Sequence, residues 1–193
     1  MKILYFDNDI IVCVKPVGID SEKGMPHELK KEFGGEIFTL HRLDLNVGGV
    51  MVYARNKKTA AELSGVIQNN AMKKEYIARV HGTPPEKGEW EDLLWKDSKR
   101  NKVYVVDRER KGVKKAKLEF LTLNKGELSE VLVLLHTGRS HQIRVQFASR
   151  GYMLAGDHKY GARDDIKAPM LWSFRLSFPY KNKLVSFEEK PIW

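Results

Sequence analysis

Apolar and polar residues alternate along several short segments of the chain, and this alternation predicts strands. In segment 74–80, Tyr76, Ala78 and Val80 fall on one face, so Tyr76 is expected to point inward. The expected strands are 3–6, 10–14, 37–40, 49–54, 74–80, 103–106, 117–123, 131–135, 171–174 and 184–187. Because strands outnumber helices and few long helices separate them, the pattern favours an α+β fold with a mixed, mainly antiparallel central sheet flanked by helices and loops.

Two helices are expected between these strands. Thr59 and Glu62 have the spacing of a capping box, and apolar residues at helical spacing follow them. Ser140 can cap a second helix that runs to about Arg150, where Gly151 is a stop signal.

The second helix places an arginine where the helix should be buried. At 100° per residue, Arg144 lies in the middle of an apolar arc, with Gln142 and Gln146 on the opposite face. A guanidinium cannot lose its proton and is costly to bury alone, so this position predicts an anion in the interior, for which Asp44 is the candidate. Two alternatives stay open: the arginine snorkels past its apolar neighbours, or it pairs with a structural carboxylate.

Asp44 itself stands in the segment 41–49, His-Arg-Leu-Asp-Leu-Asn-Val-Gly-Gly. This segment connects two expected strands, and it places one carboxylate near the cation of Arg42 in an otherwise apolar stretch. Connections of this kind often carry function. A lone carboxylate in such a place suggests chemistry.

Charge indicates the class of partner. The 193 residues carry a net charge of +9, and segment 96–117 holds ten basic and three acidic residues, or +7 of that total. Such a cluster is either a solvated basic surface or a surface that binds nucleic-acid phosphate. The only cysteine, Cys13, lies in an apolar run and is expected to be buried and inert.

No segment has the length of apolar sequence that spans a bilayer, and Asp7 comes too early for a secretory signal. We therefore expect a cytoplasmic protein that does not bind a membrane. The length fits one domain covering residues 1–193, and a monomer is expected.

Four motifs, in order, resemble those of the RluA-type pseudouridine synthases, which isomerise chosen uridines in ribosomal or transfer RNA. Lys15-Pro16-Val17-Gly18 looks like the first motif, and His41-Arg42-Leu43-Asp44 like the catalytic one. Segment 74–78 is similar to the tyrosine strand, and segment 137–145, with Gly156-Asp157 and Tyr160-Gly161 downstream, resembles the third motif. The chain departs from the family pattern at Val47-Gly48 and at Gln146.

The resemblance implies an RNA pseudouridine synthase of the corresponding catalytic fold, without an N-terminal accessory RNA-binding domain. It implies that Asp44 is the catalytic aspartate, that Tyr76 packs against the target base, and that Arg144 is the ion-pair partner of Asp44. It also implies that Arg42 helps to displace the flipped nucleotide. No metal and no other cofactor are expected, and the partner is ribosomal or transfer RNA. The residues expected to contact that RNA are Arg42, Lys74, Lys111, Lys114, Arg139 and His141.

Three alternatives fit the sequence less well. A glycoside or nucleoside hydrolase normally needs two carboxylates, and Asp157, the only plausible partner, is expected instead to be a turn aspartate that bonds its own backbone. A metal site at His136 and His141 lacks companion ligands. A non-catalytic RNA-binding module is the main alternative: it explains the charge but not an Asp44 matched with a buried Arg144.

Overall fold

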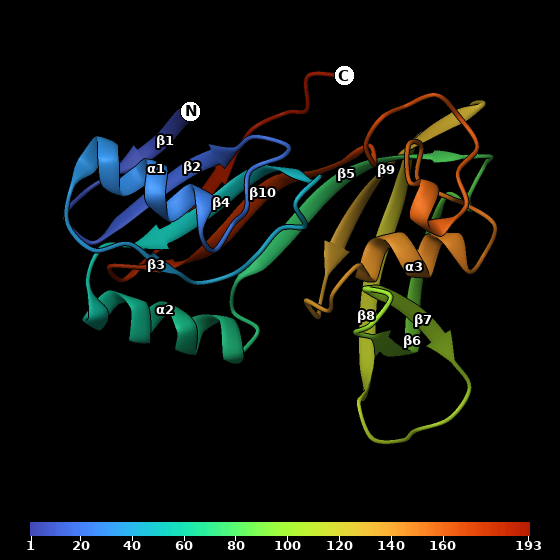
Figure 1. The fold of residues 1–193 in the computed structure, drawn as a ribbon, viewed down its shortest axis with the longest axis horizontal. Coiled ribbons are helices and arrows are strands. Elements are labelled where there is room, and N and C mark those ends of the chain that lie inside the picture. The colour runs from blue at the N-terminus through green and yellow to red at the C-terminus, as the bar shows by residue number, and fades with distance from the viewer. The chain divides into compact units, whose positions relative to one another are not determined.

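The computed structural model describes all 193 residues, which form two compact units (Figure 1). Unit 1 consists of Met1–Lys74 and Trp172–Trp193, and unit 2 consists of Glu75–Leu171. Each unit contains its own set of strands and its own buried residues. The α+β fold with a mixed, mainly antiparallel sheet is confirmed, whereas the expectation of a single domain stays a prediction.

The sheet of unit 1 is built on a hairpin, as the sequence predicts. β1 (Lys2–Phe6) pairs antiparallel with β2 (Ile10–Lys15), and β2 pairs antiparallel with β4 (Gly48–Ala54). The short β3 (Phe38–Thr39) lies along β4, and β10 (Leu171–Tyr180) pairs antiparallel with β11 (Lys183–Glu188). β4 pairs parallel with β10 at Gly48 and Gly49, the last two residues of the segment that carries Asp44.

Two helices belong to unit 1. α2 (Lys57–Gln68) contributes Leu63 to a core that includes Ile10, Val12, Val50, Val52, Met72, Leu176 and Phe178. Its N-cap is Asn56, whose side chain accepts a hydrogen bond from the Thr59 backbone at 2.9 Å, so the predicted capping box at Thr59 is wrong. α1 (Gly24–Phe33) is not predicted by the sequence, because only Met25 and Leu29 are buried and no side chain caps its start.

The sheet of unit 2 follows the order β5-β9-β8-β6-β7. Its strands are β5 (Lys73–His81), which begins in unit 1, β6 (Lys87–Asp97), β7 (Lys102–Val106), β8 (Val113–Asn124) and β9 (Leu128–Leu135). β6 is absent from the predicted strands. α3 (Gln142–Ala148) lies on one face of these strands (Figure 1). Its Phe147 packs against Trp90 and Phe120, with ring centroids 4.6 and 5.4 Å away.

α3 differs from the predicted helix in length and in burial. It has seven residues instead of about eleven, and its N-cap is His141, not Ser140. Gln142 and Gln146, which were expected to face solvent, are 2% and 0% exposed. Hydrogen bonds make this burial possible: the Gln142 amide donates to the carbonyl of Lys117, and its oxygen accepts from the Thr137 hydroxyl.

None of the helices has both the length and the apolar character needed to cross a membrane.

Candidate active site

The segment around Asp44 is a tight, internally bonded connection in unit 1. The backbone N–H of Val47 donates to the carbonyl of Asp44 at 3.0 Å. The Ser21 hydroxyl donates to the carbonyl of Leu43 at 2.9 Å and accepts from its N–H at 3.1 Å, so both backbone groups of the residue before Asp44 are fixed. Asp44 is partly buried on this connection. A carboxylate on a backbone held at both sides is a preorganised group.

A buried lysine fixes the other side of the segment. Lys15, at the end of β2, is 0% exposed, and its ammonium donates to the carbonyl oxygens of Pro16, Ile19 and Leu45 at 2.9, 2.7 and 3.2 Å. The carbonyl of Leu45 also accepts from the N–H of Gly18 at 2.9 Å. Burial lowers the pKa of Lys15 to about 8, although the carboxylates of Asp20 and Asp44 favour its charged form. The sequence identified Lys15 only as part of a motif, and its contact with the Asp44 segment comes from the structure.

The glycine pair after the segment allows the chain to enter β4 against β10. A Cβ on Gly48 would come within 2.4 Å of the Trp172 ring, and a Cβ on Gly49 within 2.3 Å of the Ser173 carbonyl oxygen. Gly49 also has a φ of +118°, which side-chain-bearing residues rarely adopt. These two positions therefore require glycine. Their close contact with β10 fixes the end of the Asp44 segment.

His41 is half-buried, and its ring is neutral at pH 7. Burial, with a contribution from the nearby Lys74, lowers its pKa to about 3. Its Nε2 accepts from the backbone N–H of Val52 at 3.2 Å, so Nδ1 carries the proton and is a buried donor without a partner. His41 therefore ties the start of the Asp44 segment to β4, through its hydrogen bond with Val52. It does not take up a proton at neutral pH.

In unit 2, Arg144 has a carboxylate partner in the interior. Its Nε and Nη2 donate to the two carboxylate oxygens of Asp157 at 2.7 and 2.8 Å, and the two side chains are 9% and 1% exposed. The prediction that Arg144 needs an interior anion is confirmed. The anion observed is Asp157, as in the alternative that Arg144 pairs with a structural carboxylate. The expectation that Asp157 bonds its own backbone is wrong, because its side chain binds the guanidinium. Asp44 and Arg144 lie in different units, and their pairing stays a prediction.

An aromatic ring and a strained histidine lie beside this ion pair. The Arg144 guanidinium carbon is 5.3 Å from the centroid of the Tyr160 ring, and the Tyr160 hydroxyl accepts from the N–H of Val103 and meets His141 Nδ1, both at 2.9 Å. His141 has a φ of +51°, in the left-handed region that non-glycine residues rarely adopt. Strained residues cluster at functional sites. The sequence indicates Tyr160 only as part of a motif and does not predict its contact with Arg144.

Tyr76 lies near the start of β5 and is 6% exposed, so its predicted inward orientation is confirmed. Its role against a target base is not a consequence of burial alone and stays a prediction.

The residues expected to contact RNA are spread over both units. In unit 1, Arg42 is exposed and its Nη1 lies 3.1 Å from Glu22, while Lys74 is half-buried. In unit 2, Arg139 is exposed and its Nε donates to the carbonyl of Lys115, while Lys111 and Lys114 are exposed around the start of β8. Arg139, through its bond to Lys115, therefore lies beside the basic segment 96–117 that carries Lys111 and Lys114.

The structure gives no support for a metal site at His136 and His141. His136 Nε2 contacts Glu119 at 2.7 Å, His141 contacts Tyr160, and no group of three or more potential ligands that could hold a metal is present.

Comparison with known proteins identifies the family. A model of the RNA pseudouridylate synthase family matches residues 9–149. The chain belongs to this family. The predicted resemblance is confirmed, and the matched region includes Asp44, Tyr76 and Arg144.

Several curated relatives are pseudouridine synthases by name. The chain is 33% identical to ribosomal large subunit pseudouridine synthase D of Borreliella burgdorferi, over 97% of this chain and 64% of the relative. It is 31% identical to the dual-specificity RNA pseudouridine synthase RluA of Escherichia coli, over 84% of this chain and 78% of the relative. The chain thus spans less than two thirds of the length of the first of these relatives.

A solved structure supports the fold. Human RNA pseudouridylate synthase domain containing 1 has a TM-score of 0.86, with 22% sequence identity over 98% of this chain and 83% of the human one. At this identity the likeness shows the fold and not the substrate.

Proposed function

We propose that the protein is an RNA pseudouridine synthase that isomerises particular uridines in ribosomal or transfer RNA. The observation that carries this proposal is the family motif around Asp44, together with the Lys15 ammonium that holds the backbone directly after it. Action on these RNAs would place the protein in the cytoplasm.

The reaction explains the residue types without a cofactor. The bond between uridine N1 and the ribose breaks, the uracil rotates, and a bond forms between C5 and the same ribose carbon. C5 releases its proton to water, and N1 takes up a proton, so the composition is unchanged. A carboxylate must be ionised to serve, whether it attacks the ribose, attacks the base or removes a ribose proton. We assign this role to Asp44 and propose Arg144 as its counter-ion, because an adjacent cation favours the charged carboxylate.

The target nucleotide must leave its stack to react. Extrusion costs a few kcal/mol, and less for a loop or bulge than for a paired base. We propose that Tyr76 offsets this cost by packing against the uracil, since stacking on an aromatic ring contributes about 1–3 kcal/mol per base. Arg42 takes the place of the displaced nucleotide, and Lys74, Lys111, Lys114, Arg139 and His141 contact the RNA.

Tritium release tests the proposal. RNA labelled at uridine C5, isolated from cells that lack the gene, should release label to water with the wild-type protein. Asp44→Asn should bind the same RNA with unchanged affinity and release none. Binding without release from any cellular RNA would identify a non-catalytic binding module instead, and free uracil would identify a hydrolase.

A further inference from the structure

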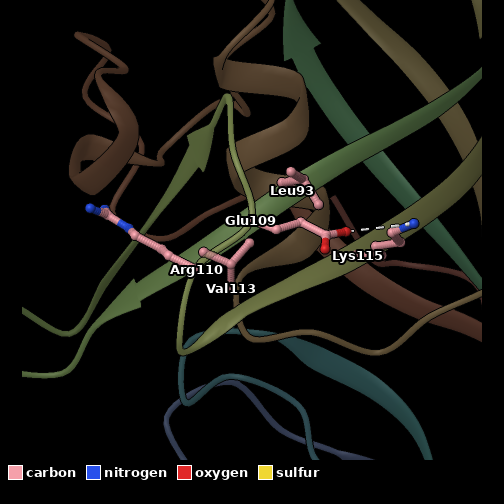
Figure 2. A pocket seen from close by; sticks show the side chains of 5 residues that line it. All are labelled: Leu93, Glu109, Arg110, Val113 and Lys115. Carbon is pink, nitrogen blue, oxygen red and sulfur yellow. Dashed lines mark ion pairs between the residues drawn. The ribbon is translucent and has the colours of Figure 1, made fainter.

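A hollow on unit 2 is lined by none of the residues assigned to the reaction. It has a volume of about 400 Å³ and is lined by Leu93 of β6, Glu109 and Arg110 of the β7–β8 loop, and Val113 and Lys115 of β8 (Figure 2). We call it the β7–β8 hollow. Its volume falls at the small end of the range for ligand pockets, which suits one nucleotide.

The lining combines aliphatic and charged groups. Leu93 and Val113 are half-buried, and their side chains offer apolar surface to a flat ring. The Glu109 carboxylate reaches toward Lys115, and Arg110 extends in the opposite direction (Figure 2). A nucleobase has the matching construction, with apolar faces and a polar edge.

Glu109 is the unexpected member of this lining. It stands between Arg108 and Arg110 in the basic segment 96–117, where a carboxylate opposes phosphate binding. Its oxygen is 3.7 Å from the Lys115 ammonium, beyond direct hydrogen-bond distance, and its side chain is 72% exposed. The carboxylate therefore keeps its capacity to accept hydrogen bonds from a ligand.

Arg110 is held at the side of the hollow. Its guanidinium carbon lies 5.0 Å from the centroid of the Trp95 ring, and Trp95 is stacked with Tyr104 at 6.2 Å. A cation placed on an aromatic ring loses less freedom when it meets a phosphate. Arg110 and Lys115 thus supply positive charge at both sides of a site whose centre has a single acceptor group.

Hydrogen-bonding chemistry selects the base. Guanine presents two neighbouring donors, N1–H and the N2 amine, which match the two oxygens of a carboxylate. Adenine and cytosine pair one donor with an acceptor that a carboxylate repels, and uracil places its N3–H between two carbonyls. We propose that the β7–β8 hollow binds an unpaired guanine of the RNA substrate through Glu109. This inference rests on the proposed function for its partner, RNA, and adds a base-specific subsite to it.

Short RNAs test the subsite directly. The probes are labelled single strands of about ten nucleotides, all uridine except for one central guanosine, adenosine or inosine, with binding followed by fluorescence anisotropy at fixed salt. The wild-type protein should bind the guanosine probe about tenfold more tightly than the adenosine probe. The inosine probe should fall between them, because hypoxanthine lacks the N2 amine.

Three variants separate base recognition from charge. Glu109→Gln should bring the guanosine preference below about twofold, because the amide presents one acceptor oxygen and one NH₂ donor, and the donor faces the second N–H of guanine. Glu62→Gln, an exposed residue of α2 with the same charge change, should keep it. Lys115→Gln should weaken all probes alike. Equal binding of the three probes by the wild type, or a preference that survives Glu109→Gln, would overturn the inference.

The tritium assay distinguishes the failure of this inference from that of the proposed function. Tritium release by a wild type that shows no guanosine preference overturns the subsite and leaves the synthase. A guanosine preference that depends on Glu109, found without tritium release from any cellular RNA, supports the subsite and removes the synthase.

Discussion

The ammonium of Lys15 donates a hydrogen bond to the carbonyl oxygen of Leu45 at 3.2 Å, so a fully buried cation holds the residue that follows Asp44. The same ammonium binds the carbonyls of Pro16 and Ile19 and thereby ties the segment 16–19 to the Asp44 segment. Because Lys15 holds the backbone next to Asp44, the Asp44 carboxylate has little freedom to move. This relationship connects the stability of unit 1 to the activity proposed for Asp44.

Replacement of Lys15 by methionine should affect both properties. Lys15→Met leaves three carbonyls without their donor, and we expect the free energy of unfolding to fall by about 1–3 kcal/mol. Tritium release should fall at least tenfold through kcat, with KM unchanged, because the Asp44 segment loses its anchor. Urea unfolding and steady-state kinetics measure the two effects. Lys2→Met, at an exposed ion pair with Glu189, is the control and should change neither; native turnover in Lys15→Met would refute the anchoring role.

The same lysine predicts how stability depends on pH. Burial lowers the pKa of Lys15 to about 8 in the folded protein, whereas an unfolded chain keeps this proton to about pH 10.4. Between these values the unfolded state binds more protons, so the contribution of Lys15 to the free energy of unfolding rises with pH. Urea unfolding of the wild type and Lys15→Met at several pH values between 7 and about 10 isolates this contribution. The wild type should gain stability relative to the variant as pH rises, and a relative loss would show that the folded-state pKa is not lowered.

The sequence predicts strands better than helices in this protein, and the residues show why. In unit 1, β2 and β4 are apolar runs, and their burial is visible from composition alone. α1 is not predicted because it is polar on most of its surface and because its N-cap, Lys23, makes no side-chain hydrogen bond to the helix start. β6 is also missed, because Lys87, Glu89, Glu91, Asp92, Lys96 and Asp97 make most of the segment charged, as in a solvated loop.

The candidate site shows a similar division. The need for a carboxylate near Arg144 follows from helical geometry, because an arginine in an apolar arc must be neutralised. Helical geometry does not say which carboxylate this is. Asp157 is thirteen residues further along the chain and reaches Arg144 only because the loop after α3 folds back. Lys15 is hidden for the same reason: its acceptors are backbone carbonyls, which leave no signal in a sequence.

Arg144 should be sensitive even to a conservative change. Lysine keeps the charge but cannot make the bidentate contact with Asp157, so Arg144→Lys should shift the site and lower tritium release by about 100-fold. Arg150→Lys is a matched control, because Arg150 also binds one carboxylate, Asp92, with both terminal nitrogens, at 2.8 and 3.1 Å. Both variants should lose some stability in urea unfolding, but only Arg144→Lys should lose activity. Equal activity in the two variants would assign Arg144 a purely structural role.

The exposed lysines around the start of β8 should act through charge alone. If Lys111 and Lys114 each contact a phosphate, Lys111→Ala and Lys114→Ala should each weaken RNA binding for all sequences. Each should also make the negative slope of log K against log salt shallower by about 1. Titration with one RNA at several salt concentrations measures the slope. Lys58→Ala, at an exposed position of α2, should leave it unchanged. Since loss of one counterion contact changes the slope and not only the affinity, a weaker complex with the wild-type slope would mean that the lysine does not touch phosphate.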